Sequence, residues 1–143
     1  MSLALIAGRG GLPARVAAAQ AEPVLRSFHD GFSWVVVVAN AAVGAWALAA
    51  HWEQRLRHRA LWWATAVAQI AIFVQVAAGV ALLSTEDIEL DQFHTFYGFV
   101  AVATVGIIYS SRDQLKSHLY LLYGFGGLFL MGLALRSMQF SPG

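Results

Sequence analysis

The sequence predicts an all-α integral membrane protein, a four-transmembrane-helix antiparallel up-down bundle with a short N-terminal arm. Two observations lead to this fold class. First, 59% of the 143 residues are hydrophobic and only 12% are charged, whereas a soluble domain carries about 25% charged residues. Second, the apolar residues gather into four stretches of about 20 residues, the length that crosses the hydrocarbon core as a helix. Because hydrocarbon offers backbone amides no water, such stretches must be helical.

The four spans are expected at residues 28–51, 60–83, 93–110 and 118–136. Their connections are short, which makes neighbouring helices run antiparallel. Residues 1–27 are expected to form an interfacial or loosely ordered N-terminal arm, in which Pro23 ends any short helix. Residues 137–143 are expected to form a short tail.

Charged residues near the span ends predict the orientation. Lysine and arginine in short loops mark the cytoplasmic side of a membrane protein. Five of the nine basic residues lie in the first and third loops, at Arg55, Arg57, Arg59, Arg112 and Lys116. We therefore expect loops 52–59 and 110–117 to be cytoplasmic and both termini to lie outside, at a bacterial-type inner (plasma) membrane.

Several classes of chemistry have no support in the sequence. The chain contains no cysteine, which excludes disulfides, thiolate metal sites and thiol redox chemistry. A net charge of +1 with scattered basic residues gives no electrostatic basis for binding nucleic acid. No HExxH motif or calcium-loop spacing is present, so we predict no catalytic residues and no metal-ion site.

Polar residues inside the spans predict how the helices pack. At about 100° per residue, Ser33, Asn40 and Gly44 fall on one stripe of the first span. Polar groups in hydrocarbon normally face the bundle interior, and asparagine with glycine is typical of a helix-packing surface. On the second span, Gln69 is the expected partner of Asn40. It shares a face with Trp62, Thr65, Phe73 and Val76.

Two residues are predicted to contact another protein chain. Gln75 lies on a different face from Gln69, and a lone amide facing lipid is unfavourable. Gly127 belongs to a glycine-rich part of the fourth span, which allows close packing either within the bundle or between chains.

Four of the five histidines form two pairs at the ends of the spans. His29 and His94 are expected near the outer end, and His51 and His118 near the inner end. Two helix-borne histidines at one level can supply both axial ligands of a haem iron. The alternative is that all four are interfacial histidines, because helix ends at the headgroup level collect amphipathic side chains.

The outer pair is the stronger candidate for haem b. Gly98 lies one turn after His94 and would leave room for the macrocycle, and Arg26 could pair with a propionate. This arrangement resembles, in architecture, four-helix b-type cytochromes and the bundles of haem A synthase. His29 and His51 are about 33 Å apart along a helix, which argues against a two-haem path across the membrane and makes the inner pair less favoured.

Two functions remain open at this point. The first is a non-catalytic accessory subunit or assembly partner of a larger membrane complex, without a cofactor. The alternative is a b-type haem-binding protein with one outer-face haem, acting in quinone- or haem-linked redox chemistry. The expected partners are the lipid bilayer and other membrane protein subunits or further copies of the chain, with no nucleic acid.

Overall fold

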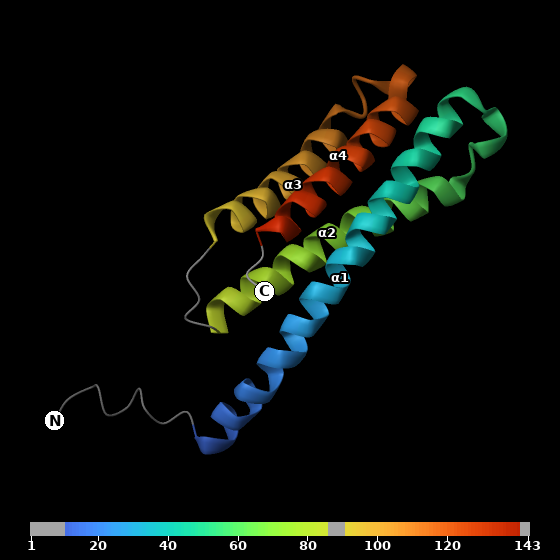
Figure 1. Cartoon of the computed structure of the whole chain (residues 1–143). Coiled ribbons are helices and arrows are strands. Elements are labelled where there is room, and N and C mark those ends of the chain that lie inside the picture. Colours follow the sequence, from blue (N-terminus) through green and yellow to red (C-terminus); the bar gives the residue numbers. More distant parts are fainter. Residues whose placement is uncertain (1–10, 86–90, 141–143) are drawn as a thin grey trace.

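The computed structural model describes residues 11–85 and 91–140, and these form helices joined by short turns (Figure 1). Two single-turn 3-10 segments lie at the same end of the bundle, η2 (Gln54–Leu56) between α1 and α2, and η3 (Lys116–His118) before α4. Among the described residues there is no strand. The four long helices are α1 (Leu12–Trp52), α2 (Arg59–Thr85), α3 (Gln92–Ser111) and α4 (Leu119–Gln139).

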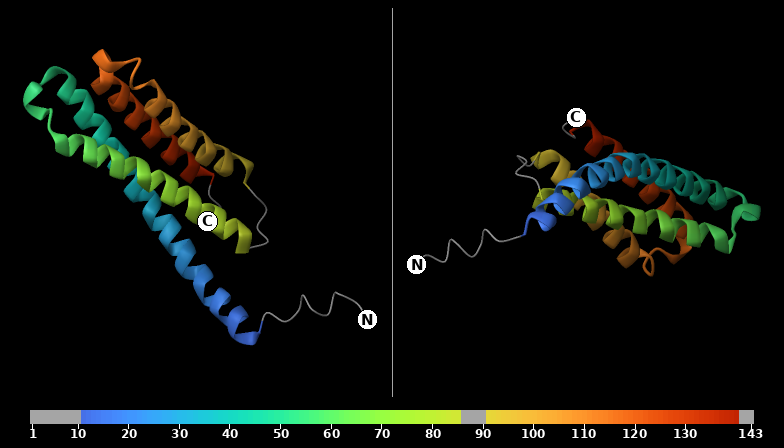
Figure 2. Two further views of the ribbon diagram at one scale, coloured as in Figure 1. Left: turned by 180° about the vertical axis from the view of Figure 1, so that it is seen from behind. Right: turned by 90° about the horizontal axis from the view of Figure 1, so that it is seen from below.

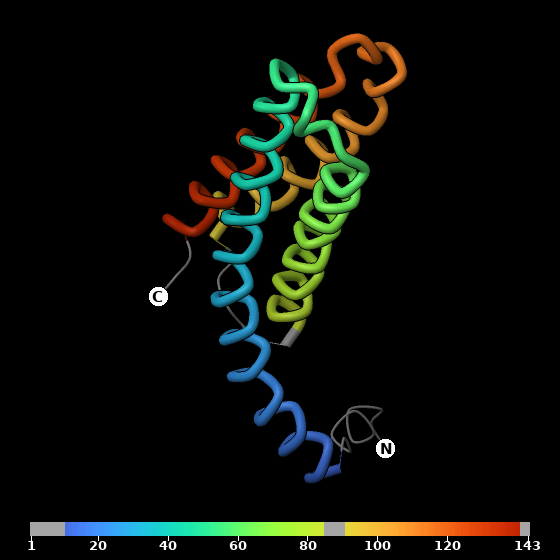
Figure 3. The backbone as a smooth tube through the Cα atoms, turned by 90° about the vertical axis from the view of Figure 1, so that its right-hand side faces the viewer, coloured from blue at the N-terminus to red at the C-terminus, as the bar shows by residue number. Residues whose placement is uncertain are grey.

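The second, third and fourth helices begin and end within three residues of the expected spans, but α1 does not. It begins at Leu12 and continues through Pro23, so the expectation that Pro23 ends a helix is wrong. Proline removes one backbone hydrogen bond, and here the unpaired carbonyl belongs to an exposed turn. At about 1.5 Å per residue the 41 residues of α1 extend about 60 Å, and its first turns project beyond the bundle (Figure 3).

Consecutive helices run in opposite directions, and they do not pack equally (Figure 2). The largest interface joins α1 to α4, followed by α1 with α2 and α3 with α4. Contact between α2 and α3 is the smallest of the four. The bundle is therefore built on a closely packed α1–α4 pair. Helix α2 packs against α1, helix α3 packs against α4, and α2 and α3 make little contact with each other.

The α1–α4 interface depends on two glycines whose backbones nearly touch. A Cβ atom placed on Gly127 would lie 2.9 Å from Cα of Gly44 and 3.1 Å from the carbonyl oxygen of Asn40. Small residues at such crossings let two backbones approach closely. Of the two packings left open for Gly127, the structure shows the one within the bundle, because its open side is filled by α1 of the same chain.

The buried face of α2 differs from the expected one. It is the series Leu61, Thr65, Ala68, Ile72, Gln75, Gly79 and Leu82, in which Gln75 and Gly79 are half-buried. Phe73 is 45% exposed and lies outside this face. Asn40, which is 1% exposed, donates from Nδ2 to the Ala68 carbonyl at 3.3 Å and to Val36 at 2.9 Å. The predicted Asn40–Gln69 pair is therefore wrong, and a backbone carbonyl takes the place of the Gln69 amide.

The outside of the bundle is apolar. All four helices are long and apolar enough to cross a membrane. Large side chains such as Trp34, Trp63, Phe99 and Phe125 are more than half exposed. Soluble monomers rarely expose contiguous apolar patches beyond a few hundred Å², so the surface is that of an integral membrane protein.

Candidate functional site at the outer end of the bundle

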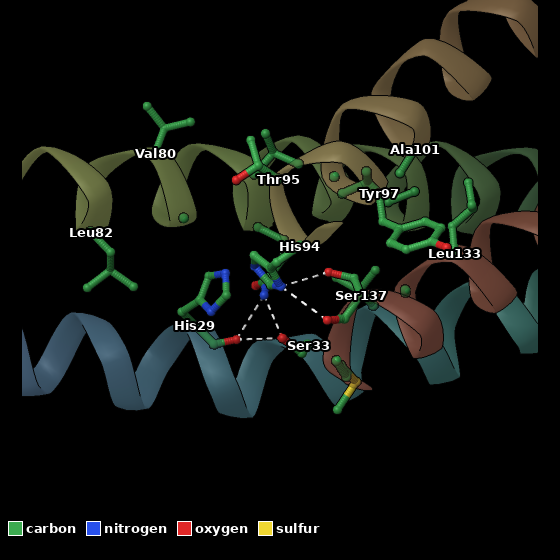
Figure 4. A pocket seen from close by; sticks show the side chains of 18 of the residues that line it. His29, Ser33, Val80, Leu82, His94, Thr95, Tyr97, Ala101, Leu133 and Ser137 are labelled. Atoms are coloured by element: carbon green, nitrogen blue, oxygen red, sulfur yellow. Dashed lines mark hydrogen bonds between the residues drawn. The ribbon is translucent and has the colours of Figure 1, made fainter. Parts of the chain in front are cut away.

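A cavity of about 180 Å³ lies where the first part of the α1 span meets the end of α2, the start of α3 and the end of α4. We keep the expected names for the two ends of the bundle: the outer end holds this cavity, and the inner end holds η2 and η3. Its walls are mainly apolar, and a few polar side chains converge on it (Figure 4). These polar residues are Arg26, His29, Asp30, Ser33, Gln75, Asp91, His94, Thr95 and Ser137. An apolar pocket with a few convergent polar groups is typical of ligand sites.

Gln75 forms the polar link between α2 and α1 at this cavity. Its Nε2 donates to the His29 carbonyl at 2.9 Å and to Oγ of Ser33 at 2.6 Å. Ser33 in turn donates from Oγ to the same carbonyl at 2.8 Å. The prediction that Gln75 contacts another chain therefore loses its basis, since the amide nitrogen is bound inside the bundle. Oε1 of Gln75 is buried and has no partner among the described residues.

His94, on the first turns of α3, is oriented by the end of α4. Its Nδ1 lies 3.1 Å from the carbonyl oxygen of Ser137 and 3.0 Å from Oγ of the same serine. A carbonyl can only accept, so a hydrogen bond to it needs hydrogen on Nδ1, whereas the serine hydroxyl can also donate to a bare Nδ1. The tautomer that bonds the carbonyl leaves the lone pair on Nε2, which is the arrangement found in metal-ligating histidines.

His29 is 7% exposed and lies on the α1 face that meets α2. Its Nδ1 is 3.6 Å from Oδ1 of Asp30, so a carboxylate lies near this ring atom but beyond hydrogen-bond distance. On the other side of the ring, a Cβ atom placed on Gly79 would lie 3.3 Å from Nε2. Glycine at this point of α2 gives the imidazole room that any larger residue would take.

The structure brings His29 and His94 together across the cavity (Figure 4). Their ring centres are 5.7 Å apart and the ring planes are inclined by 58°. With metal–nitrogen bonds of about 2.0–2.1 Å, two imidazoles on opposite sides of one metal ion have ring centres about 6 Å apart. The observed separation is close to that value. Gly98 and Arg26, the other residues predicted for a haem site, both line the same cavity.

The inner histidines are not brought together. The ring of His51 packs edge-on against Trp52, with ring centres 5.0 Å apart. His118 is exposed and its Nδ1 contacts Oγ of Ser117 at 2.8 Å. Each is therefore in contact with its neighbour in the sequence, and neither lines the cavity that holds His29 and His94.

The donor set at the outer end restricts which group it could hold. Residues 11–85 and 91–140 contain no cluster of three or more His, Cys, Asp or Glu side chains that could hold a metal ion. Structural zinc sites use four protein ligands and catalytic ones three, so two imidazoles are too few. Haem iron needs only axial ligands from the protein, because the porphyrin supplies the other four. The residues present therefore fit haem better than a bare metal ion.

Sequence reasoning missed two residues at the cavity. Ser137 falls in the predicted tail, yet α4 continues through it and places its carbonyl against His94. Gly79 carries no polar signal of its own, although it follows Gln75 by four residues and so lies on the same helix face. A helix face centred on Gln75 would have included it.

No family model, curated protein or solved structure matches the chain.

Proposed function

We propose that this chain is a b-type haem protein of the membrane, with His29 and His94 as the axial ligands of one haem near the outer face. The observation that carries the proposal is the pair of imidazole rings 5.7 Å apart, each with an oxygen acceptor near its Nδ1. Metal-ligating histidines almost always donate the other ring N–H to a carbonyl, carboxylate or water. Interfacial histidines that only face headgroups have no need of such matched orientation.

The haem would supply one-electron redox chemistry, in a quinone-linked or haem-linked reaction. The chain's own residues would bind and orient it. The carbonyl of Ser137 would hold the His94 ring in the tautomer that presents Nε2. Asp30, whose Oδ1 is 3.6 Å from Nδ1 of His29, would have to move closer to do the same for His29. Gly98 and Gly79 would leave space beside the two rings, and the guanidinium of Arg26 could pair with a propionate at the mouth of the cavity.

The proposal includes a position in the membrane. The four long helices would cross a bacterial-type inner (plasma) membrane, with loops 52–59 and 110–117 in the cytoplasm and the haem near the opposite face. Single cysteines at Gln54 and Gln92 test this in a chain that has no cysteine of its own. A membrane-impermeant thiol reagent added outside should label position 92 and spare position 54, and the reverse pattern would contradict the orientation.

The accessory-subunit interpretation loses one of its supports. It rested on the lack of convergent catalytic groups, on a soluble portion too small for a domain, and on Gln75 as a contact to another chain. The Gln75 amide nitrogen is bound within the bundle. This interpretation remains the alternative that a colourless protein would favour.

An absorption spectrum tests the proposal. Protein purified in detergent from haem-replete cells should show a Soret band, and this band should be lost in His29→Ala and in His94→Ala. The matched control is His118→Ala, which removes an exposed histidine outside the cavity and should leave the band unchanged. A colourless wild-type protein, or a Soret band that survives both outer substitutions, would overturn the proposal.

A further inference from the structure

The cavity at the outer end has the size of one aromatic ring. An engineered apolar cavity of about 150 Å³ binds benzene, and the volume here is about 180 Å³. The additional space suits small substituents on such a ring. A porphyrin is several times larger, so haem would enter only if the walls moved apart, whereas a single substituted ring fits the cavity as it stands.

The wall of the cavity on α2 extends to the lipid-facing surface of the bundle. Val80 and Leu83 both line the cavity, and they are 60% and 37% exposed. A molecule dissolved in the bilayer therefore meets apolar side chains both at the surface and inside. Of the charged residues that line the cavity, Arg26 and Asp30 are exposed and Asp91 is half-buried. The lining thus favours an uncharged, lipid-soluble ligand, because an ion gains nothing from apolar walls.

Two hydrogen-bond acceptors belong to residues that line this cavity and have no partner among the described residues. Oε1 of Gln75 is buried and unpaired, although Nε2 of the same amide is bound to α1. The hydrogen bonds that His94 makes with described residues all involve Nδ1. In the tautomer that bonds the Ser137 carbonyl, Nε2 of His94 carries a free lone pair. Since a buried acceptor without a donor is costly, a ligand with O–H groups is favoured here.

We propose that the cavity binds the ring of a lipid-soluble hydroquinone, a benzene ring with two hydroxyl groups opposite each other. The hydroxyl groups would donate to Oε1 of Gln75 and Nε2 of His94, and an apolar chain on the ring would leave past Val80 and Leu83. The oxidised form, a quinone, has only acceptors and would leave Oε1 of Gln75 unpaired. The inference does not rest on the proposed function, because such a ring and haem would compete for His94.

Binding by the full chain purified without haem tests the site. The probe is a hydroquinone that carries a decyl chain, added to the protein in detergent and measured by titration calorimetry. The matched ligands are its oxidised quinone form and decylbenzene, which has the ring and the chain but no hydroxyl. We expect the hydroquinone to bind on the order of 10-fold more tightly than either, because only it donates hydrogen bonds. Equal affinity for all three would overturn the proposal.

A substitution that fills the cavity tests its place in the structure. Gly98 lines the cavity, and a Cβ atom there would meet only Cγ2 of Val76 within 4 Å, at 3.7 Å. This distance is ordinary contact, so Gly98→Leu should fold, and we expect it to weaken hydroquinone binding by at least about 10-fold. Gly106→Leu, also on α3 but with no atom within 4 Å of the added Cβ, should bind as wild type does. Unchanged affinity in Gly98→Leu would overturn the site.

A second substitution tests the hydrogen bond apart from the fold. Gln75→Met keeps the length of the side chain and removes Oε1. It should reduce the preference for the hydroquinone over decylbenzene several-fold, while the affinity for decylbenzene reports whether the cavity is intact. Gln69→Met, which removes an amide from another face of α2, should keep the wild-type preference. An unchanged preference in Gln75→Met, with decylbenzene still bound, would overturn the assigned contact.

The haem spectrum separates this inference from the proposed function. A protein that binds the hydroquinone but has no Soret band would keep the ring site and overturn the haem. A Soret band in a protein whose haem-free form does not bind the probe would overturn the ring site alone. If both ligands bind, saturating hydroquinone should slow the uptake of added haem, because both need His94. Haem uptake that is unaffected by the probe would overturn the ring site.

Discussion

At the inner end of the bundle, where loops 52–59 and 110–117 lie, the helices are tied by side chains that reach from one to another, whereas at the outer end they enclose a cavity. Arg57 donates from Nε to the Ala50 carbonyl and from Nη2 to the His51 carbonyl, each at 2.8 Å, and lies 4.7 Å from the ring centre of Tyr120. At the outer end, the polar contacts surround a cavity, and α2 and α3 share the smallest of the four helix interfaces.

Under the proposed function, this difference would let one small bundle be stabilised at its inner end and bind a ligand at its outer end. At the inner end a cation satisfies two of the last carbonyls of α1, and the Trp62 ring packs tilted against Tyr120 and edge-on against Tyr123. The outer end has the two histidines, an amide oxygen of Gln75 without a partner among the described residues, and glycines in place of larger side chains. We expect changes at the inner half to alter stability and changes at the outer end to alter binding.

The largest effect should follow from Gly127→Val. The added side chain would collide with the backbone of α1, since even a Cβ atom would lie 2.9 Å from Cα of Gly44. Overpacking typically costs about 1–3 kcal/mol and more where backbone must move, so we expect the free energy of unfolding in detergent to fall by about 3 kcal/mol. Gly132→Val, on the same helix with open space around it, is the control. Equal stability of the two variants would show that the α1–α4 crossing is looser than described.

A smaller loss of stability is expected for Arg57→Ala. The change removes two charge-assisted hydrogen bonds and a cation–π contact at an exposed helix end, worth about 1–2 kcal/mol together. Thermal unfolding followed by circular dichroism measures it, and haem affinity should not change. Arg112→Ala removes a cation that lies over Tyr109 without bonding a carbonyl of another segment, and should cost less. If Arg57→Ala weakened haem binding and kept normal stability, this would contradict the expectation that the inner end governs stability and the outer end governs binding.

For Ser137→Ala we expect weaker haem binding and little change in stability. The substitution removes Oγ, one of two oxygens near Nδ1 of His94, and leaves the carbonyl. Loss of a partner of this kind typically costs about 10–100-fold in metal affinity, so we expect about 10-fold weaker haem binding in a titration. Ser110→Ala removes a hydroxyl that bonds only its own helix and serves as the control. Unchanged affinity in both would mean that the carbonyl alone orients the ring.

The smallest effect is expected for Asn40→Leu. Its Nδ2 bonds the Ala68 carbonyl across helices, but its Oδ1 is buried without a partner among the described residues. Interhelical hydrogen bonds in membrane proteins average about 0.6 kcal/mol, and removing an unpaired polar atom offsets part of that. We expect the free energy of unfolding to change by less than about 1 kcal/mol, as for Thr104→Val, whose hydroxyl bonds its own helix. If the free energy of unfolding fell by several times this amount, the Asn40 contact would contribute more to stability than the contact between Gly44 and Gly127.

The helices of the bundle were predictable because their signal is length and hydropathy, which do not depend on neighbours. The face of each helix was not equally predictable. On α1 a stripe of polar residues including His29, Asn40 and Gly44 marks the buried side. On α2 nearly every residue is apolar, and Thr65 belongs both to the predicted face with Gln69 and to the observed face with Gln75. Hydropathy therefore did not distinguish the two faces, and the predicted face was the wrong one.

The sequence by itself determined that four long apolar helices would form, roughly where they begin and end apart from the start of α1, and that His29 and His94 would lie at one level near the same end of the bundle. These follow from the need of backbone amides for partners in hydrocarbon and from a rise of about 1.5 Å per residue. Only the tertiary structure decided that Gln75 and Gly127 face inward, that Ser137 meets His94, and that α2 and α3 barely touch. In lipid both sides of a helix are apolar, so close contact between specific side chains, and not hydropathy, selects the face that is buried.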